Sequence, residues 1–386
     1  MTPPPSHPIL LSADAQRLES RLMGGDEARE WPAMQLAGRA LARAICRDSA
    51  EIGGLRTDGR LLALVGKGHN GGDALIATQA LLERFPAAQA DVLFAFGSRA
   101  LRPLAARAWQ ELVQAAAGRI AVVREIGGPY EACLDGVFGF QFRPPVEAPV
   151  AALLAQANAA PIRLRAAVDL PSAGRFRADF TYATGSVKQP VLGAPEAGRV
   201  RYLDLGFFRG DEAGEERVLL PQVLDPLSRW RSPAGDKRDY GHVFVIGGSG
   251  QYPGAVLMAV LAALRSGVGL VTAFVPETLA AAYAARAPEA MWVGWPQTPE
   301  GGLALEGEHL LRARLERATA LVLGPGLGRE PETLALAASI ARHSPGPLVL
   351  DADALQPEIV QAGGAPRIAT PHAGELARIG GRAVLR

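Results

Sequence analysis

The segment Leu61–Ala77, LLALVGKGHNGGDALIA, decides how the first half of this chain folds. A short apolar run ends in a loop with four glycines, and a helical pattern follows at once. Glycine lets the backbone turn sharply and bring its N–H groups close to a ligand. The start of the following helix adds a partial positive charge. The segment therefore predicts an anion site, although a tight strand–helix turn that binds nothing is an equal alternative.

Composition indicates a globular protein of two domains. A chain of 386 residues is too long for one typical core. Its 40 lysines and arginines against 39 acids give no field that favours nucleic acid or a membrane. Cys46 and Cys133 form no metal-ligand spacing and no disulfide framework, which fits a reducing compartment. With neither a signal peptide nor a bilayer-length apolar run, we expect a soluble cytoplasmic protein.

Short apolar runs alternate with helical patterns along the first half. A helix is expected over Pro32–Arg47 with proline in its first turn, and a loose arm over Pro3–Pro8. Strands are expected at Leu61–Val65, Asp91–Phe96, Ile120–Val123, Leu134–Phe138, Arg165–Asp169, Phe180–Ala183 and Val200–Leu205. This alternation predicts an α/β protein whose parallel sheet is covered by helices on both faces.

A second α/β unit is expected after a linker. The stretch Leu219–Asp239 carries three prolines and mixed charge without periodicity. We place the domains at residues 1–220 and 239–386, with a linker over 221–238. The pattern restarts with a strand at His242–Ile246, the loop GGSGQYPG and a helix over Ala255–Ser266.

Three loops of the first half follow expected strands: Gly66–Asp73, Asp135–Arg143 and Asp169–Ser172. Because ligands in open α/β sheets bind at the carboxyl ends of strands, we expect these loops to form one site. Each has a plainer explanation as a tight turn, a solvated acid or an acid that caps a turn. Their occurrence together favours the site.

The three loops, with sequences GKGHNGGDA, LDGVFGFQFR and VDLPSAG, resemble the NAD(P)H-hydrate epimerase domain, and the match extends over nearly all of Ile9–Phe208. The resemblance implies that the first loop holds the phosphates of hydrated NAD(P)H and that Asp169 is the acid/base. It implies a potassium ion held by Asn70, Asp135 and Ser172. Substrate contacts are implied for His69, Asn70, Gly71, Gly72, Asp73, Gly139, Phe140, Gln141, Phe142 and Arg143.

The chain departs from that family's pattern at three positions. His69 stands where the family has the first of two asparagines, Ala74 replaces a glycine, and Gln141 replaces the second glycine of its loop. An exposed side chain is the favoured interpretation of His69, although it could still reach a phosphate. Gln141 is expected to narrow the pocket.

A carboxyl group at Asp169 and oxygen donors beside it suit the epimerisation that the resemblance implies. Hydrated NAD(P)H carries a hydroxyl beside the ring nitrogen, and hydroxide is a poor leaving group. A carboxyl group that donates a proton helps the carbon–oxygen bond open, and water then returns on the other face. An oxygen-only set from Asn70, Asp135 and Ser172 suits a hard cation.

The second half resembles the ADP- or ATP-dependent NAD(P)H-hydrate dehydratases, which have a ribokinase-like fold. The match begins with KRDYGHVFVIGGSGQYPGAVLMAVLAALRSGVGLVTAFVPE at Lys237–Glu277 and continues with LVLGPGLGRE, LVLDADAL and TPHAGELARI. It implies that Ala255, Gly326 and His372 contact the hydrated nucleotide, and that ADP is used, with Mg²⁺ as an accompanying ion. Taken singly, these residues also fit helix packing, a strand-end turn and a helix cap.

The expected function is therefore repair of hydrated NADH or NADPH by epimerisation and ADP-dependent dehydration. A non-catalytic scaffold and a small-molecule kinase are the alternatives. Asn70, Asp135 and Asp169 argue against a scaffold, and the GGSGQYPGA and TPHAGE segments favour a dehydratase over a kinase. Homo-oligomers are compatible with the resemblance.

The dehydratases continue with a lysine–glycine segment and a GTGD loop, which hold the adenine nucleotide and supply the catalytic aspartate. Nothing in this sequence matches either segment, so we expect the second half, as given, not to complete dehydration. A thermal-shift titration with ADP tests this expectation. Clear stabilisation by ADP would contradict it.

Overall fold

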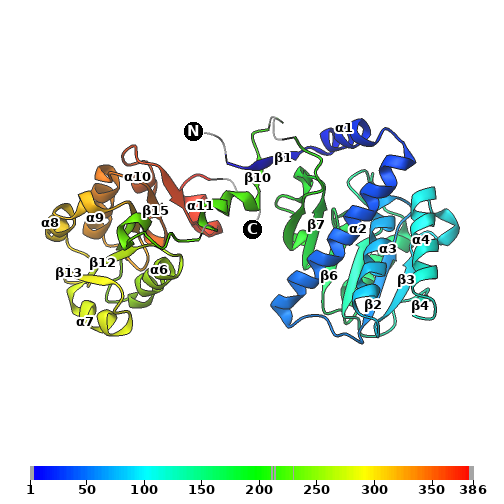
Figure 1. The fold of residues 1–386 in the computed structure, drawn as a ribbon, viewed down its shortest axis with the longest axis horizontal. Coiled ribbons are helices and arrows are strands. Elements are labelled where there is room, and N and C mark those ends of the chain that lie inside the picture. Colours follow the sequence, from blue (N-terminus) through cyan, green and yellow to red (C-terminus); the bar gives the residue numbers. More distant parts are fainter. Residues whose placement is uncertain (1–3, 210–211, 213, 229, 382–386) are drawn as a thin grey trace. The chain divides into compact units, whose positions relative to one another are not determined.

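The computed structural model describes residues 4–209, 212, 214–228 and 230–381. The chain divides into two compact units, with the described residues up to 228 in the first and those from 230 in the second. Each unit has its own parallel sheet between helices (Figure 1). The expected α/β class is confirmed.

The first unit is built on a parallel seven-stranded sheet of order β4-β3-β2-β5-β6-β7-β9. Its strands are β2 (Arg60–Val65), β3 (Gln89–Phe94), β4 (Ile120–Val122), β5 (Ala132–Gly136), β6 (Arg165–Val168), β7 (Phe180–Thr184) and β9 (Arg199–Leu203). All seven expected strands are present, shifted by at most two residues at either end.

Side chains along β2 point alternately to the two faces of the sheet and contribute to two separate hydrophobic cores. Leu61 and Ala63 pack with helices α2 (Glu27–Ser49), α3 (His69–Arg84) and α4 (Pro103–Ala115). Leu62 and Leu64 point to the opposite face and pack with α5 (Ala148–Ala159). Because successive side chains of a strand point to opposite faces, one apolar run serves both layers.

Helix α2 begins earlier than expected. The side chain of Asp26 accepts a hydrogen bond from the backbone N–H of Ala28 at 2.9 Å and caps the helix there. Pro32 consequently lies inside the helix and not in its first turn, so that expectation was wrong. Apolar side chains of the helix, including Met34 and Leu41, are buried.

A small sheet of order β10-β1-β8 was not expected, and it corrects the expectation of a loose arm over Pro3–Pro8. Strand β1 (Ser6–Leu10) pairs with β10 (Arg217–Leu219) and β8 (Val187–Lys188). Arg217 donates hydrogen bonds to the carbonyl oxygen of Ser6 at 2.7 Å and to its hydroxyl at 2.8 Å. The small sheet fixes the chain that leads into helix α1 (Ser12–Met23).

The second unit has a parallel sheet of order β13-β12-β11-β14-β15-β16. The strands are β11 (His242–Ile246), β12 (Leu270–Pro276), β13 (Met291–Trp295), β14 (Ala320–Leu323), β15 (Leu348–Leu350) and β16 (Arg367–Ala369). Helices α6 (Pro253–Arg265) and α7 (Glu277–Arg286) cover one face, and α8 (Glu308–Arg312), α9 (Pro331–His343) and α10 (Pro357–Val360) cover the other.

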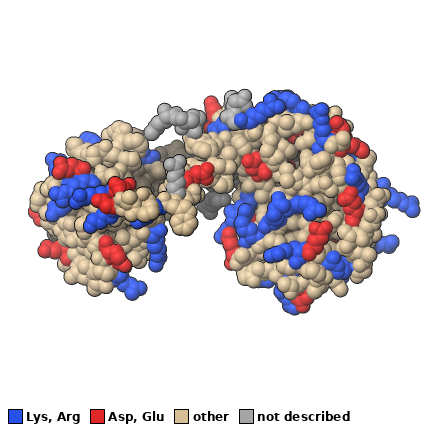
Figure 2. Space-filling view, in the orientation of Figure 1, with Lys and Arg blue, Asp and Glu red and all other residues tan. Residues whose placement is uncertain are grey.

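The surface carries no dominant charge on the face shown in Figure 2, where basic and acidic side chains are interspersed on both units. Within the described part of the chain, no helix is both long enough and apolar enough to cross a bilayer.

Truncation of Leu41 should test the core around α2. Leu41 is 0% exposed, and Leu41→Ala is expected to lower the free energy of unfolding by about 2–5 kcal/mol because it leaves a cavity. Leu36, on the same helix, is 45% exposed, and Leu36→Ala should change it by less than about 0.5 kcal/mol. Urea titrations of both variants measure the difference. Equal effects would contradict this packing.

Candidate active site

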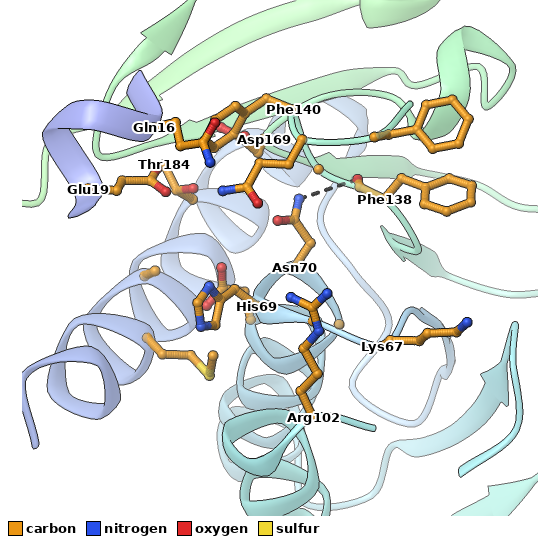
Figure 3. Close-up of a pocket in the computed structure, with 18 of the residues that line it drawn as sticks. Gln16, Glu19, Lys67, His69, Asn70, Arg102, Phe138, Phe140, Asp169 and Thr184 are labelled. Atoms are coloured by element: carbon orange, nitrogen blue, oxygen red, sulfur yellow. Dashed lines mark hydrogen bonds between the residues drawn. The ribbon is translucent and has the colours of Figure 1, made fainter. Parts of the chain in front are cut away.

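A cavity of about 900 Å³ opens at the carboxyl ends of β2, β5 and β6. Helix α1, the start of α2, the glycine-rich loop and the loop after β5 line it (Figure 3). Its size is in the upper part of the range for small-molecule sites. The structure places ten of the expected substrate-site residues on its wall: His69, Asn70, Gly71, Asp73, Gly139, Phe140, Gln141, Phe142, Arg143 and Asp169.

Gly72 lies elsewhere. A Cβ atom added at Gly72 would sit 2.7 Å from the sulfur of Met34, so this glycine faces α2 and lets α3 pack closely against it. Asp135 and Ser172 lie below the cavity wall and are buried. The structure thus separates the expected site into a cavity wall and a buried layer.

The glycine-rich loop packs backbone against backbone. A Cβ atom at Gly66 would overlap the carbonyl oxygen of Val137, and one at Gly71 would overlap the carbonyl oxygen of Gly66. Helix α3 starts at His69, so the amides of its first turn have no partner within the helix and are available to an anion in the cavity. Lys67 and Arg102 extend from the same side, as Figure 3 shows.

His69 matches its favoured interpretation as an exposed loop side chain only in part. Its side chain is 59% exposed, but it lines the cavity, and its Nε2 lies 3.4 Å from a carboxylate oxygen of Glu30.

Asp135, at the end of β5, and Ser172, in the loop after β6, are hydrogen-bonded to each other, and Asn70 reaches towards the ends of the same two strands from the start of α3. The Ser172 hydroxyl donates to one oxygen of Asp135 at 2.6 Å, and the Ser172 backbone N–H donates to the other at 2.8 Å. Burial raises the pKa of Asp135 to about 6, and the hydrogen bonds from Ser172 oppose the rise. Asn70 donates to the carbonyl oxygen of Val168 at 2.8 Å.

Asp169 follows β6 in the left-handed region, with a φ of 68°, a backbone conformation that residues other than glycine rarely adopt. Its buried carboxylate accepts a hydrogen bond at 2.6 Å from the ammonium group of Lys188, which is only 1% exposed. Lys188 also donates to the carbonyl oxygen of Thr184 at 3.0 Å. Burial raises the pKa of Asp169, and Lys188 opposes the rise.

Two further carboxyl groups belong to the same cluster. Glu19 on α1 lies 3.9 Å from the Lys188 ammonium, and its pKa is raised to about 7, chiefly by burial. Asp73 on α3 is buried, and among the described groups its Oδ1 has no hydrogen-bond partner. Burial raises the pKa of Asp73 well above its ordinary value, and the charges of Asp169 and Glu19 add to the rise. Two carboxyl groups, Glu19 and Asp169, therefore approach one ammonium, and its charge also acts on Asp73.

Sequence reasoning did not single out Lys188 or Glu19. A signal for Lys188 exists, because it is the only charged residue in the otherwise apolar and uncharged stretch Phe180–Leu192. Glu19 gives no comparable signal, since the helix that carries it was not expected.

In the second unit, two of the three expected residues lie side by side. Gly326 has a φ of 66°, and a Cβ atom there would sit 3.4 Å from the Cβ of Ala255 on α6. His372 caps α11 (Ala373–Arg378), where its Nδ1 accepts a hydrogen bond from the N–H of Gly374 at 3.1 Å. This cap is the plainer explanation of His372.

Family profiles match both units. A profile described as NAD(P)H-hydrate dehydratase matches residues 243–385, and one described as YjeF-related protein N-terminus matches residues 32–189. A solved ADP/ATP-dependent NAD(P)H-hydrate dehydratase from Bacillus subtilis, co-crystallized with ATP/Mg²⁺, is 29% identical over 39% of this chain and 50% of its own, with a TM-score of 0.31.

Curated relatives extend over both units. The bifunctional NAD(P)H-hydrate repair enzyme Nnr of Gloeobacter violaceus is 37% identical and covers 95% of this chain and 75% of its own length. That of Moorella thermoacetica is 32% identical, over 83% of this chain and 65% of its own. The ADP-dependent (S)-NAD(P)H-hydrate dehydratase of Xanthomonas campestris is 37% identical, over 39% of this chain and 52% of its own. The expected resemblance is confirmed, and this chain belongs to the family of bifunctional NAD(P)H-hydrate repair enzymes.

Proposed function

We propose that the first unit interconverts the two epimers of NAD(P)H hydrate, with Asp169 as acid/base. One observation carries the proposal. Asp169, held by Lys188, lines the same cavity as the amides at the start of α3, which have no partner within that helix. A dinucleotide can thus place its phosphates at the helix start and its hydrated ring beside the carboxylate.

The reaction replaces the hydroxyl at a single carbon and needs proton transfers to the leaving oxygen and from the entering water. A carboxyl group donates its proton to the ring hydroxyl, the carbon–oxygen bond breaks, and water leaves with the bonding electron pair. The ring nitrogen lone pair then forms a carbon–nitrogen double bond, which leaves the ring positively charged. Water adds to the other face of that carbon, and its extra proton passes to a carboxylate. Each positioned carboxyl group contributes roughly a hundred- to ten-thousandfold in rate.

The rest of the wall holds the substrate. We assign the phosphates to the backbone of residues 69–71, with Asp73 on the ring side of the loop. The loop from Gly139 to Arg143 closes over the nucleotide, with Phe140 and Phe142 as apolar surfaces. The Phe140 ring lies 5.1 Å from the Lys188 ammonium, so this loop contacts the acid/base cluster directly. Gln141 lines the cavity from the same loop.

Potassium fits the buried layer. Asn70, Asp135 and Ser172 would hold the ion, because they supply oxygen donors of the kinds that hard cations prefer. Among the described residues, Asp135 forms no ion pair, although its carboxylate is fully buried. The bound ion would supply positive charge next to the loops that hold the phosphates.

For the second unit, we propose that Ala255, Gly326 and His372 contact the hydrated nucleotide, and that ADP with Mg²⁺ is its co-substrate. The proximity of Gly326 and Ala255 supports the first part. The chain spans 65 to 75% of the length of the bifunctional relatives described above.

The epimerase proposal predicts faster interconversion of hydrated NADH epimers in the presence of the protein. Starting from one purified epimer, chromatography should show relaxation to the mixture well above the rate in buffer. Asp169→Asn removes the titrating group and should lower kcat by about a hundredfold or more. A wild-type rate equal to that in buffer would contradict the proposal and favour a non-catalytic module.

Removal of potassium should lower the rate. Protein dialysed into a tetramethylammonium buffer is expected to lose activity and to regain it with KCl but not with LiCl, because the small lithium ion does not fit the same donors. Ser172→Ala should weaken the response to KCl. A rate that is independent of the cation would contradict the potassium site.

The Lys188–Asp169 pair should show strong coupling in stability. Lys188→Met leaves a buried carboxylate without its counter-charge and should cost about 3–5 kcal/mol of unfolding free energy. Adding Asp169→Asn should recover part of that loss, as urea titrations of the single and double variants would show. Asp58→Asn, at the exposed Arg56–Asp58 pair, is the control and should have no measurable effect. Additive losses would contradict the coupling.

A further inference from the structure

Epimerisation poses a problem that one fixed carboxylate does not solve. The hydroxyl leaves from one face of the ring carbon, and water arrives on the opposite face. Asp169 is buried and held by the Lys188 ammonium at 2.6 Å, so it cannot swing from one face to the other. A second group is needed to exchange a proton on the other face.

We propose that Glu19 is the second catalytic acid/base of this cavity, and that it works with Asp169 so that each carboxyl group serves one face of the hydrated ring. The inference rests on the proposed epimerase function. Glu19 enters the cavity from α1, whereas Asp169 enters from the end of β6 (Figure 3). Both approach the same ammonium, at 3.9 and 2.6 Å.

The other carboxyl groups of the wall are less suited to this role. Asp73 is buried, so its carboxyl group has little access to the water that must enter and to solvent for proton exchange, and burial raises its pKa. Glu30 faces His69 at 3.4 Å, and Glu147 is exposed at the start of α5. Glu19 is the carboxyl group that combines contact with Lys188 and a partly open side chain, which is 31% exposed.

With two carboxyl groups, the protons given and taken up are equal in number over one catalytic cycle. The active state holds one proton on the pair: the protonated carboxyl group donates to the leaving hydroxyl, and the ionised one accepts from the entering water. Each turnover transfers the proton from one member of the pair to the other. Exchange with solvent through the partly open Glu19 restores the starting state.

The need for one proton on the Glu19–Asp169 pair determines how the rate of epimerisation depends on pH. Burial is the largest cause of the raised pKa of Glu19; Lys188 opposes the rise, whereas the charges of Asp169 and Glu30 add to it. Asp73 also interacts with Glu19. Glu19 is neutral below about pH 7 and ionised above it. At higher pH the pair holds no proton to give to the hydroxyl. Thus kcat/KM should fall as the pH rises through about 7, identically in both directions, because the equilibrium between epimers does not depend on pH.

Four variants of α1 test the proposal with hydrated NADH as substrate. Glu19→Gln should lower kcat by about a hundredfold, leave KM within about threefold, and abolish the fall in kcat/KM near pH 7. Glu19→Asp keeps a carboxyl group and should retain that fall, with a smaller loss of rate. Asp14→Asn changes the same charge on the same helix outside the cavity, and should behave as wild type. Formate added to Glu19→Ala should restore part of the rate.

The outcomes separate this inference from the proposed function. If Asp169→Asn is inactive while Glu19→Gln keeps the wild-type rate and pH profile, Glu19 is not the second acid/base and the epimerase assignment stands. If the wild-type protein does not accelerate epimerisation, both fail. Urea midpoints show whether Glu19→Gln is folded. If it is not, a Glu19→Asp variant without a fall in kcat/KM near pH 7 overturns the inference.

Discussion

The buried ion pair between Lys188 and Asp169 is the interaction on which the site depends. Two charges removed from water are costly unless each is close to the other and hydrogen-bonded. Here the ammonium also donates to the carbonyl oxygen of Thr184, and β8, which carries Lys188, is fixed by pairing with β1. Strand β1 thus has a role beyond completing the small sheet. It positions the Lys188 ammonium, which stabilises the ionised form of the buried Asp169.

Close backbone packing is the second constraint, and it acts on the opposite side of the cavity. A Cβ atom on Gly139 would sit 2.6 Å from the side-chain oxygen of Asn70, so the loop after β5 and the start of α3 approach only through glycine. Asn70 reaches across to the carbonyl oxygen of Val168, directly before Asp169. The helix start and the acid are therefore joined through one side chain.

The sequence predicted the strands and the three loops because β2 and its neighbours are continuous apolar runs bounded by glycine, proline and aspartate. It did not predict β1 or α1. The sequence SHPIL of β1 contains a proline, and α1 buries only Ala15 and Leu18, too sparse a pattern to stand out. Lys188 and Glu19 belong to these small elements. The roles of individual residues cannot be derived from periodicity, since they depend on burial that arises only when distant segments meet.

Charge is divided along the cavity, and this division orients a dinucleotide. Lys67, Arg102 and the start of α3 form a positive end suited to phosphates. At the other end Glu19 and Asp169 approach Lys188, and the charge of Lys188 also acts on Asp73. Loss of water leaves the nicotinamide ring positively charged. An acidic end is therefore where that charge is best stabilised, since fixed charges act most strongly when they oppose charge that develops during reaction. Lys188 opposes the rise that burial causes in the pKa of these carboxyl groups, and so favours the ionised form that stabilises the cation.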